Sequence, residues 1–311
     1  MRGQGLAGSC LAWQLWWEGS RDFRLVDRAS RKGSSDVAAG MINPIAGKGW
    51  NPGWQLERFL PRAVSFYRRV EQETGGDFYL PIEIERRIES EKDSRKVREK
   101  WGLLEPWIDQ ERSGDEALWI RGGRLRTREF LDATRAFFVD YGLFSETSGE
   151  DGRVVLCEGA EGLMRLGLRH RSAKGQILTV RGEMELEHIL VAGGIWVVPE
   201  GGGLFRVGAT YEWDVLDNAP TEEGRVKLLE KAEEVLGAVE LVEHVAGVRP
   251  ILRQSQPVIG QLPCGDFIFN GLGSKGSIYA PLAARELARH LLRGEKISRD
   301  LDFQEWEGRE S

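Results

Sequence analysis

A glycine-rich segment at the start of the chain, Gly3-Gln4-Gly5-Leu6-Ala7-Gly8, places the tightest constraint on what it can fold into. The segment has the pattern G-x-G-x-x-G, which binds dinucleotides when a strand precedes it and a helix follows it. In such a turn the first glycine allows a tight bend, the second lets the backbone approach a pyrophosphate, and the third lets the helix pack closely on a sheet. We expect Gly3, Gly5 and Gly8 in these roles, with the phosphates at the N-terminus of the helix.

The residues around this segment meet part of what the pattern requires. A helix is expected over residues 6–19, and a short β-type run over 23–26 ends at Asp27, whose carboxylate would accept hydrogen bonds from a ribose diol. Only Met1 and Arg2 precede the glycines, whereas a strand needs about five residues. Two explanations stay open: the true start lies upstream of Met1, or the chain has lost its central strand.

Composition excludes several other classes of protein. The chain has 311 residues, enough for about two domains, and its formal net charge of −6 argues against non-specific binding of nucleic acid. No apolar run approaches the roughly 18 residues of a membrane-spanning helix, and no signal-peptide pattern is visible. The three cysteines are too scattered for a disulfide framework, and the four histidines lack the spacing of metal ligands. A cytoplasmic protein without a bound metal is expected.

Helices and strands alternate at both ends of the chain, while the middle is richer in strands. Helical spacing and capping residues indicate further helices over residues 55–74, 127–141, 221–236 and 281–292. The charged residues 83–100 are typical of a solvated helix face. This arrangement predicts an α/β domain built from the two chain ends and interrupted by a second domain of the α+β class.

A second glycine-rich segment near the C-terminus has the same order of elements as the first. A strand over residues 266–270 runs into Gly271-Leu272-Gly273-Ser274-Lys275-Gly276, and a helix follows. Successive backbone N–H groups in such a loop form a concave site for negative charge at the start of a helix. In a flavoprotein, that charge is carried by the N1–C2=O edge of the reduced flavin.

Four segments of the sequence, in the same order, resemble the D-amino-acid oxidase superfamily of FAD-dependent oxidoreductases, which includes glycine oxidase and sarcosine oxidase. They reach across nearly the whole chain. They are residues 3–8 with Asp27; Gly33-Ser34-Ser35-Asp36-Val37-Ala38-Ala39-Gly40; Gly247-Val248-Arg249-Pro250 followed by Gln256-Pro257-Val258-Ile259-Gly260; and residues 271–276. A weaker match is the strand-like run that ends at Gly159. The sequence departs from the family in its short start and in the short interval 142–153, where relatives usually have additional strands.

The resemblance implies both the fold and the division of the chain. It implies an α/β protein with a Rossmann-like FAD-binding domain of the three-layer, glutathione-reductase type, and an inserted α+β substrate domain. We expect the FAD-binding domain to comprise residues 1–47, 145–170 and 257–311, and the substrate domain to comprise residues 48–144 and 171–256.

The resemblance also implies FAD as the cofactor. Neither Cys10 nor Cys264 stands in a motif of covalent flavin attachment, so non-covalent binding is expected. The residues expected to contact FAD come from the segments that carry the resemblance. They are Gly3, Gly5, Leu6, Ala7, Gly8, Asp27, Arg28, Ser34, Ser35, Ala38, Ala39, Gly40, Gly159, Gly271, Leu272, Gly273, Ser274 and Gly276.

Three residues are expected at the reacting end of the site. Arg249 matches the arginine that grips the substrate carboxylate in amino-acid oxidases, where a guanidinium offers a bidentate fork; the alternative is a structural ion pair. Trp196 falls on the strand that faces the substrate side of the flavin, with core packing as the alternative. Lys275 would stabilise the reduced flavin anion, unless it is a solvent-facing loop residue. Arg253 and Tyr211 are weaker candidates.

The chemistry implied by the family is oxidation of an amine or amino acid. A hydride passes from the carbon beside the amine to flavin N5, the imine hydrolyses, and O2 or another acceptor reoxidises the flavin. The partner is then a small carboxylated amine, with no nucleic acid, no membrane span and an undetermined oligomeric state. Two alternatives stay open: a flavoenzyme acting on an aminomethyl-modified tRNA uridine, and a non-catalytic remnant that lost FAD binding with its first strand.

Overall fold

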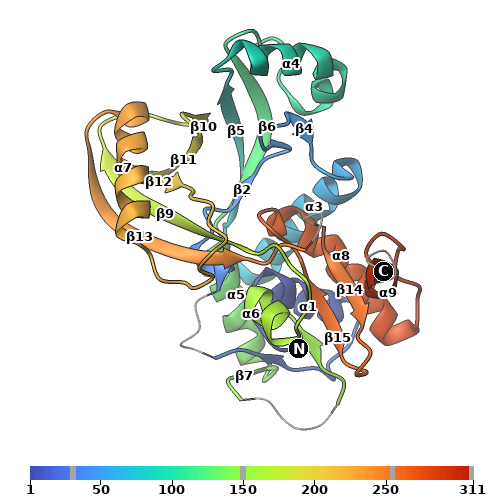
Figure 1. Ribbon diagram of the computed structural model, residues 1–311. Helices are drawn as coiled ribbons and strands as arrows, with labels where there is room; N and C mark the ends of the chain where they lie inside the picture. Colours follow the sequence, from blue (N-terminus) through green and yellow to red (C-terminus); the bar gives the residue numbers. More distant parts are fainter. Residues whose placement is uncertain (29–32, 148–151, 253–255, 308–311) are drawn as a thin grey trace.

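The computed structural model describes residues 1–28, 33–147, 152–252 and 256–307. Figure 1 shows a small sheet near both termini and a larger sheet of eight strands formed by the middle of the chain. In the part of the chain that the structure describes, no helix is both long and apolar enough to cross a membrane.

The small sheet takes its strands from widely separated parts of the chain. They are β7 (Phe144–Ser145), β1 (Leu25–Val26), β8 (Val155–Leu156), β15 (Phe267–Asn270) and β14 (Val258–Gln261). β1 pairs with β7 and β8 pairs with β15 in parallel, while β14 runs antiparallel to β15. The alternation seen at the two chain ends in the sequence thus corresponds to one shared sheet.

The first residues of the chain lie in the centre of this sheet. Arg2 forms parallel bridges to Val26 of β1 and to Leu156 of β8. The backbone N–H of Gly3 donates to the Val26 carbonyl at 2.8 Å, and the N–H of Cys157 donates to the Arg2 carbonyl at 2.8 Å. The central place between β1 and β8, for which the sequence offers only two residues, is therefore filled, and the glycine-rich turn leaves the sheet directly from it.

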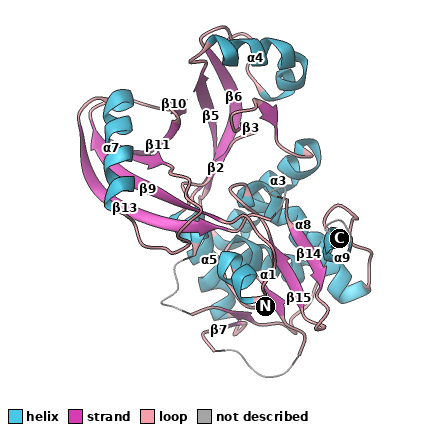
Figure 2. Ribbon diagram, viewed as in Figure 1, coloured by secondary structure: helices cyan, strands magenta, loops and turns pink. Residues whose placement is uncertain are grey.

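The large sheet is almost entirely antiparallel (Figure 2). Its strands, in spatial order, are β13 (Val239–Arg249), β9 (Ala173–Gly182), β12 (Leu204–Gly208), β11 (Ile195–Gly201), β10 (Ile189–Ala192), β5 (Tyr79–Arg87), β6 (Ala117–Leu125) and β2 (Met41–Ile42). Only the β10–β5 pair is parallel. The short strands β3 (Ile45–Ala46) and β4 (Asn51–Pro52) form a separate hairpin beside it.

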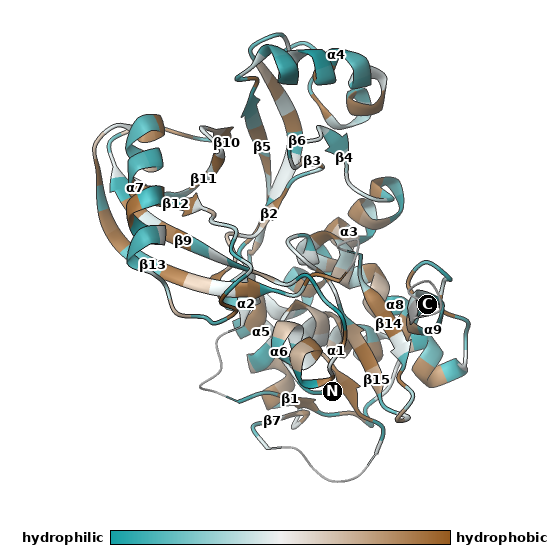
Figure 3. Cartoon of the chain, viewed as in Figure 1, coloured by the Kyte–Doolittle hydropathy of each residue, from teal (hydrophilic) through white to brown (hydrophobic). Residues whose placement is uncertain are grey.

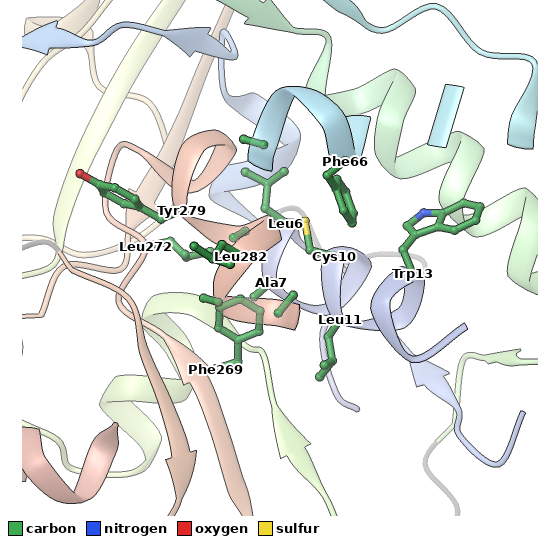
Figure 4. Close-up of a cluster of buried hydrophobic side chains, with 14 of the residues drawn as sticks. Leu6, Ala7, Cys10, Leu11, Trp13, Phe66, Phe269, Leu272, Tyr279 and Leu282 are labelled. Atoms are coloured by element: carbon green, nitrogen blue, oxygen red, sulfur yellow. The ribbon is translucent and has the colours of Figure 1, made fainter. Parts of the chain in front are cut away.

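The main core lies against the small sheet, where four helices meet. These are α1 (Leu6–Trp17), α3 (Leu56–Thr74), α5 (Thr127–Asp140) and α8 (Gly276–Arg293). Figure 4 shows side chains of α1, α3 and α8 packed together with Phe269 of β15. Trp13 is fully buried and its indole N–H donates to Thr134 Oγ1 at 2.9 Å, so this tryptophan serves the core. Figure 3 shows that helix α4 (Glu91–Leu104), unlike the helices of this core, is largely hydrophilic.

The last long helix begins five residues earlier than the sequence predicted. A start at Pro281 is expected because proline lacks the N–H that an interior helical position donates. In the structure Pro281 lies inside α8, and the Tyr67 hydroxyl donates to the Ser277 carbonyl at 2.9 Å. That carbonyl is the one left without its helical donor by Pro281, so a side chain from α3 completes the helix. The N-terminus of α8 consequently reaches back to Gly276.

The charged residues 83–100 are not one helix face, as the sequence suggested. Residues 83–87 belong to β5, and α4 starts only after Ser90, whose side chain accepts from the Asp93 backbone N–H at 3.2 Å. The interpretation failed because charged residues alternate in β5 with buried ones such as Ile84. The many charged side chains made it hard to recognise the two-residue alternation of burial that is typical of a strand.

The division into two domains stays a prediction, although the packing bears on it. Helices α3 and α5, expected in the substrate domain, pack in the same core as α1 and α8. Strand β2, expected in the FAD-binding part, pairs with β6 of the large sheet. The remaining described helices are α2 (Ser34–Val37), α6 (Gly159–Arg165), α7 (Glu222–Leu236) and α9 (Phe303–Glu307), with a 3-10 turn at Glu105–Trp107. Thr221 caps α7 through the Gly224 N–H, as predicted.

Candidate active site

A cavity of about 720 Å³ lies between the loops above the small sheet and one end of the large sheet. Its lower wall comes from the glycine-rich turn, the segment around α2, the start of α6 and the start of α8. Its upper wall comes from β9, β11, β12, β13 and the β3–β4 hairpin. Segments distant in sequence, including all four that carry the family resemblance, therefore line one space.

The N-terminal turn leaves no room for side chains at two of its glycines. Gly3 has φ +98°, and a Cβ on it would lie 2.5 Å from the Cys157 carbonyl oxygen. A Cβ on Gly8 would overlap the Gly3 carbonyl oxygen. Gly5 is the N-cap of α1 and offers no side chain to the first N–H groups of the helix. Ser35 Oγ accepts from the Leu6 N–H at 3.2 Å. The turn is thus tight, and the N-terminus of the helix directs positive charge into the cavity.

The second glycine loop places another helix N-terminus beside the first. Gly271 and Gly273 have φ +77° and +56°, which favour glycine. The Gly273 N–H donates to the Pro250 carbonyl at 2.8 Å, which fixes the loop to the end of β13. A Cβ on Gly276 would lie 2.9 Å from Leu6 Cδ1, so the starts of α1 and α8 are in contact. Two helix N-termini, neither of them capped by the side chain of its own N-cap residue, therefore open into the same cavity.

An acidic side chain stands where the sequence expected one. Asp27 lines the cavity, and its Oδ2 lies 3.8 Å from Arg135 Nη2 of α5. Arg135 also donates through Nε to Gln4 Oε1 at 2.6 Å, so one arginine holds two cavity-lining side chains. The neighbouring Arg28 is exposed and does not line the cavity.

Arg249 projects at the end of β13 into the upper part of the cavity. Its guanidinium lies 4.6 Å from the centre of the Tyr211 ring, and Nη1 donates to the Thr210 carbonyl at 3.4 Å. A Cβ on Gly175 would overlap the guanidinium, so that glycine provides its space. Burial lowers the pKa of Arg249. Among the described residues no carboxylate forms an ion pair with it, so the alternative of a structural ion pair has no partner there.

Trp196 and Lys275 also line the cavity. Trp196 is half-buried on β11, and its ring lies over Gly208, where a Cβ would overlap it. Lys275 is the N-cap residue of α8, and its Nζ lies 3.0 Å from the position of a Cβ on Gly53. Burial alone lowers the pKa of Lys275. Its ammonium has no hydrogen-bond or ion-pair partner in the described part of the chain.

Most of the residues expected from the sequence share this cavity. Those that line it are Gly3, Gly5, Leu6, Ala7, Asp27, Ser34, Ser35, Ala38, Ala39, Gly40, Gly159, Trp196, Tyr211, Arg249, Leu272, Gly273, Ser274, Lys275 and Gly276. Gly8 and Gly271 lie behind the wall, where they allow close packing. Arg253 lies outside the described residues.

One charged residue of the site escaped the sequence analysis. Arg86 is buried on β5, lines the cavity and donates to the carbonyls of Ile45 at 3.0 Å and Gly47 at 2.7 Å. Its guanidinium lies 3.6 Å from the centre of the Trp50 ring, and burial lowers its pKa to about 10. No signal distinguished it among the charges of 83–100, because its partners are backbone groups of the distant β3–β4 hairpin.

The cavity joins a dinucleotide-type turn to an antiparallel sheet whose Arg249 has no ion-pair partner among the described residues. This arrangement indicates an enzyme that uses a dinucleotide cofactor. The family described as "DAO: FAD dependent oxidoreductase" matches residues 3–290, and the chain belongs to this family. The protein is therefore an enzyme, an FAD-dependent oxidoreductase with an α/β, Rossmann-like fold, as the sequence predicted.

Comparisons with single proteins agree with this assignment. The chain is 30% identical, over 94% of its length and 95% of the relative, to a putative thiamine biosynthesis oxidoreductase ThiO of Rhizobium etli. It is 29% identical over 39% of its length to the tRNA-modifying bifunctional protein MnmC of Marinobacter nauticus, of which the match covers 22%. The solved glycine oxidase of Geobacillus kaustophilus has the same fold, with a TM-score of 0.77, 18% identity, and 96% and 94% of the two chains covered.

The residues of the cavity fit FAD. The cofactor carries a diphosphate, a ribose and a flavin ring whose pyrimidine edge becomes negative on reduction. The two helix N-termini suit these negative groups, and the turn has no space for a residue larger than glycine at positions 3 and 8. Asp27 lines the same cavity, and its carboxylate would accept hydrogen bonds from a ribose. Residues 3–7, Asp27 and residues 272–276 would therefore hold the cofactor.

Proposed function

We propose that this enzyme oxidises the C–N bond of a small amine or amino acid that carries a carboxylate. The observation that carries the proposal is Arg249, a guanidinium partly withdrawn from water without an acidic partner among the described residues. Such a group binds a carboxylate through two parallel hydrogen bonds. It lies in the same cavity as the loops that fit FAD. The name of the solved relative, glycine oxidase, agrees with a substrate of this kind.

Bound FAD supplies an acceptor for the hydride that leaves the carbon beside the amine. Arg249 binds the substrate carboxylate, and the Tyr211 ring beside it limits how the guanidinium can turn. Trp196 walls the pocket from β11 and excludes water. Lys275, at the start of α8, adds positive charge where the helix N-terminus already favours a negative group. With FAD bound, the imine product would hydrolyse to a carbonyl compound and ammonia or an amine, with O2 or another acceptor as the final oxidant.

We expect FAD to be bound without a covalent bond. Cys10 is buried in the core, and Cys264 is exposed and does not line the cavity. Cys157 does line it, but burial raises the pKa of its thiol to about 12. A thiol that is protonated at neutral pH is a poor nucleophile, so no cysteine is suited to attachment.

The test is to mix the purified holoenzyme anaerobically with carboxylated amines, beginning with glycine and sarcosine, and to follow flavin absorbance. We expect bleaching by at least one of them. Arg249→Met should lower kcat/KM at least 100-fold, because a desolvated bidentate contact is lost, while Arg249→Lys should recover part of it. Flavin released by denaturation would establish non-covalent binding. The proposal would be contradicted if amines with a carboxylate and amines without one bleached the flavin equally, in the wild type as well as in Arg249→Met.

A second candidate function is oxidation of an aminomethyl group on a tRNA uridine. It is favoured by the match to the tRNA-modifying MnmC and by an exposed aromatic pair beside the cavity, Tyr211 and Trp213, with ring centres 5.4 Å apart. Exposed aromatic rings offer faces on which a base can stack. A gel shift of undermodified tRNA that weakens steeply with salt would support this function. The net charge of −6 weighs against it.

A further inference from the structure

We propose that Lys174 is a positioning residue that, through Asp217, holds residues 211–218 over Arg249 and thereby sets substrate affinity. The inference rests on the proposed function, because Arg249 is taken as the carboxylate-binding group. Lys174 lies on β9, outside the cavity wall, and has no part in the chemistry described above.

The side chain of Lys174 is buried in an unusual way. It is 1% exposed, and its Nζ lies 2.6 Å from Asp217 Oδ1, whereas the Asp217 side chain is 53% exposed. Withdrawing an ammonium from water is costly unless it is paired and hydrogen-bonded. Its ion-pair partner in the described part of the chain is Asp217, in an irregular segment between β12 and α7. A buried strand residue thus reaches outward to hold a surface segment.

That segment forms part of the cavity but has little packing of its own. Tyr211, Leu216 and Asn218 line the cavity. Trp213 and Val215, between them, are large apolar side chains exposed to solvent. A segment with such exposed side chains gains little from burial, so its place depends on where it is anchored.

The ends of the segment are fixed by β9. The N–H of Lys174 donates to the Glu212 carbonyl at 2.8 Å, and the Glu212 N–H donates back at 3.0 Å. Gln176, which is fully buried, donates to Glu212 Oε1 at 2.7 Å and to Thr221 Oγ1 at 2.9 Å. Residues 213–220 span the two ends, and the Lys174–Asp217 ion pair holds this span at its middle.

The same stretch of β9 forms the floor beneath Arg249. Gly175, next to Lys174, gives the guanidinium its space, and Tyr211, at the start of the segment, lies against its other side. Loss of the Lys174–Asp217 ion pair would free Leu216 from the cavity wall and loosen Tyr211. Substrate binding should weaken, while the cofactor end of the cavity is left as it is.

The test compares Lys174→Met, Lys174→Arg and Asp217→Asn in the FAD-loaded enzyme, with Glu200→Gln as matched control. Glu200 pairs with the buried Arg124 and neither side chain lines the cavity, so this pair also joins a buried cation to a more exposed acid. We expect Lys174→Met and Asp217→Asn to raise KM about tenfold with kcat within twofold, and Lys174→Arg to restore most of the affinity. The amide hydrogens of residues 211–219 should exchange faster in Lys174→Met and Asp217→Asn only.

A purely structural ion pair predicts a different result. In that case Asp217→Asn would lower Tm as Glu200→Gln does, with KM and the exchange of residues 211–219 unchanged, and the inference would be overturned. Should no amine or amino acid reduce the bound FAD of the wild type, the proposed function fails. Hydrogen exchange then still decides the role of Lys174: faster exchange of residues 211–219 in Lys174→Met supports it, and unchanged exchange overturns it.

Discussion

At the scale of single residues, the cofactor end of the site depends on glycines, because their lack of a Cβ lets backbone segments approach closely. Gly8 permits the first turn of α1 to touch the Gly3 carbonyl, and Gly3 permits the backbone to pass the Cys157 carbonyl. These positions were correctly singled out in the sequence because the spacing of the glycines encodes the turn. The space around Arg249 could not be found in this way. Gly175 comes from β9, and Tyr211, which the sequence offered only as a weaker candidate, lies in the irregular segment after β12.

Replacement of Gly8 by alanine tests this close approach. The added Cβ overlaps the Gly3 carbonyl oxygen, so α1 must move away from the turn. We expect the Kd for FAD to rise at least tenfold and the free energy of unfolding to fall by about 1–3 kcal/mol, the usual cost of overpacking. Fluorescence titration with FAD and urea unfolding measure the two effects.

The control for this prediction is Gly102→Ala in α4. A Cβ there meets nothing within 4 Å, so the variant should be neutral or more stable by up to about 1 kcal/mol, with FAD affinity unchanged. Equal losses of affinity in the two variants would show that the Gly8 contact has no special role.

At the scale of elements, α4 and β5 hold the β3–β4 hairpin against the cavity. Lys96 donates to the Lys48 carbonyl at 2.9 Å and to Asp93 Oδ1 at 3.0 Å. Trp50 donates from its indole N–H to the same Asp93 atom at 3.0 Å and lies under Arg86. An element that the sequence presented only as a charged surface therefore supports one wall of the site.

This support predicts a pH dependence of stability. Hydrogen bonds from Trp50, Lys96 and Ser90 lower the pKa of Asp93 from 3.8 to about 2. Because the folded-state pKa is depressed, the stabilisation is present above about pH 4 and is lost as the pH falls toward 2. In urea unfolding, the advantage of wild type over Asp93→Asn should shrink by about 1 kcal/mol across this range, a value kept small by partial exposure.

Asp115→Asn is the comparison, since this side chain is 90% exposed and its nearest cation, Arg98, is 4.0 Å away. Between pH 5 and 2, the advantage of wild type should fall more over Asp93→Asn than over Asp115→Asn. If the free energies of unfolding of Asp93→Asn and Asp115→Asn depend on pH in the same way, Asp93 does not hold the hairpin through its charge.

How far the elements could be predicted depended on whether their signal was local. The N-cap Thr221 and the apolar spacing of α3 lie within the elements they define, and both helices begin within one residue of where the sequence placed them. The start of α8 could not be found this way, because the donor that satisfies Ser277 is Tyr67, more than 200 residues away. The same holds for Arg86, whose partners lie in another hairpin.

At the scale of the whole molecule, the cavity separates charge along its length. The acidic side chains that line it, Asp27, Asp36, Glu158 and Glu161, come from the loops of the cofactor end. The cationic ones, Lys48, Arg86, Arg249 and Lys275, surround the β3–β4 hairpin and the end of β13. Among the described residues no carboxylate lines that second region. The chain as a whole is acidic, so this local excess of positive charge is a property of the fold rather than of the composition.

The separation predicts the sign of the ligand that the holoenzyme selects. Propionate and propylamine are similar in size and opposite in charge, and neither can be oxidised as an amino acid. We expect propionate to perturb the flavin spectrum and propylamine to leave it unchanged at equal concentration, because only an anion compensates the half-buried Arg249 and Lys275. Raising the ionic strength should weaken the propionate effect only modestly, since partly buried charges are poorly screened. In Arg249→Met the effect should disappear, and binding of propylamine as tight as that of propionate would mean that the cations do not govern which substrates enter.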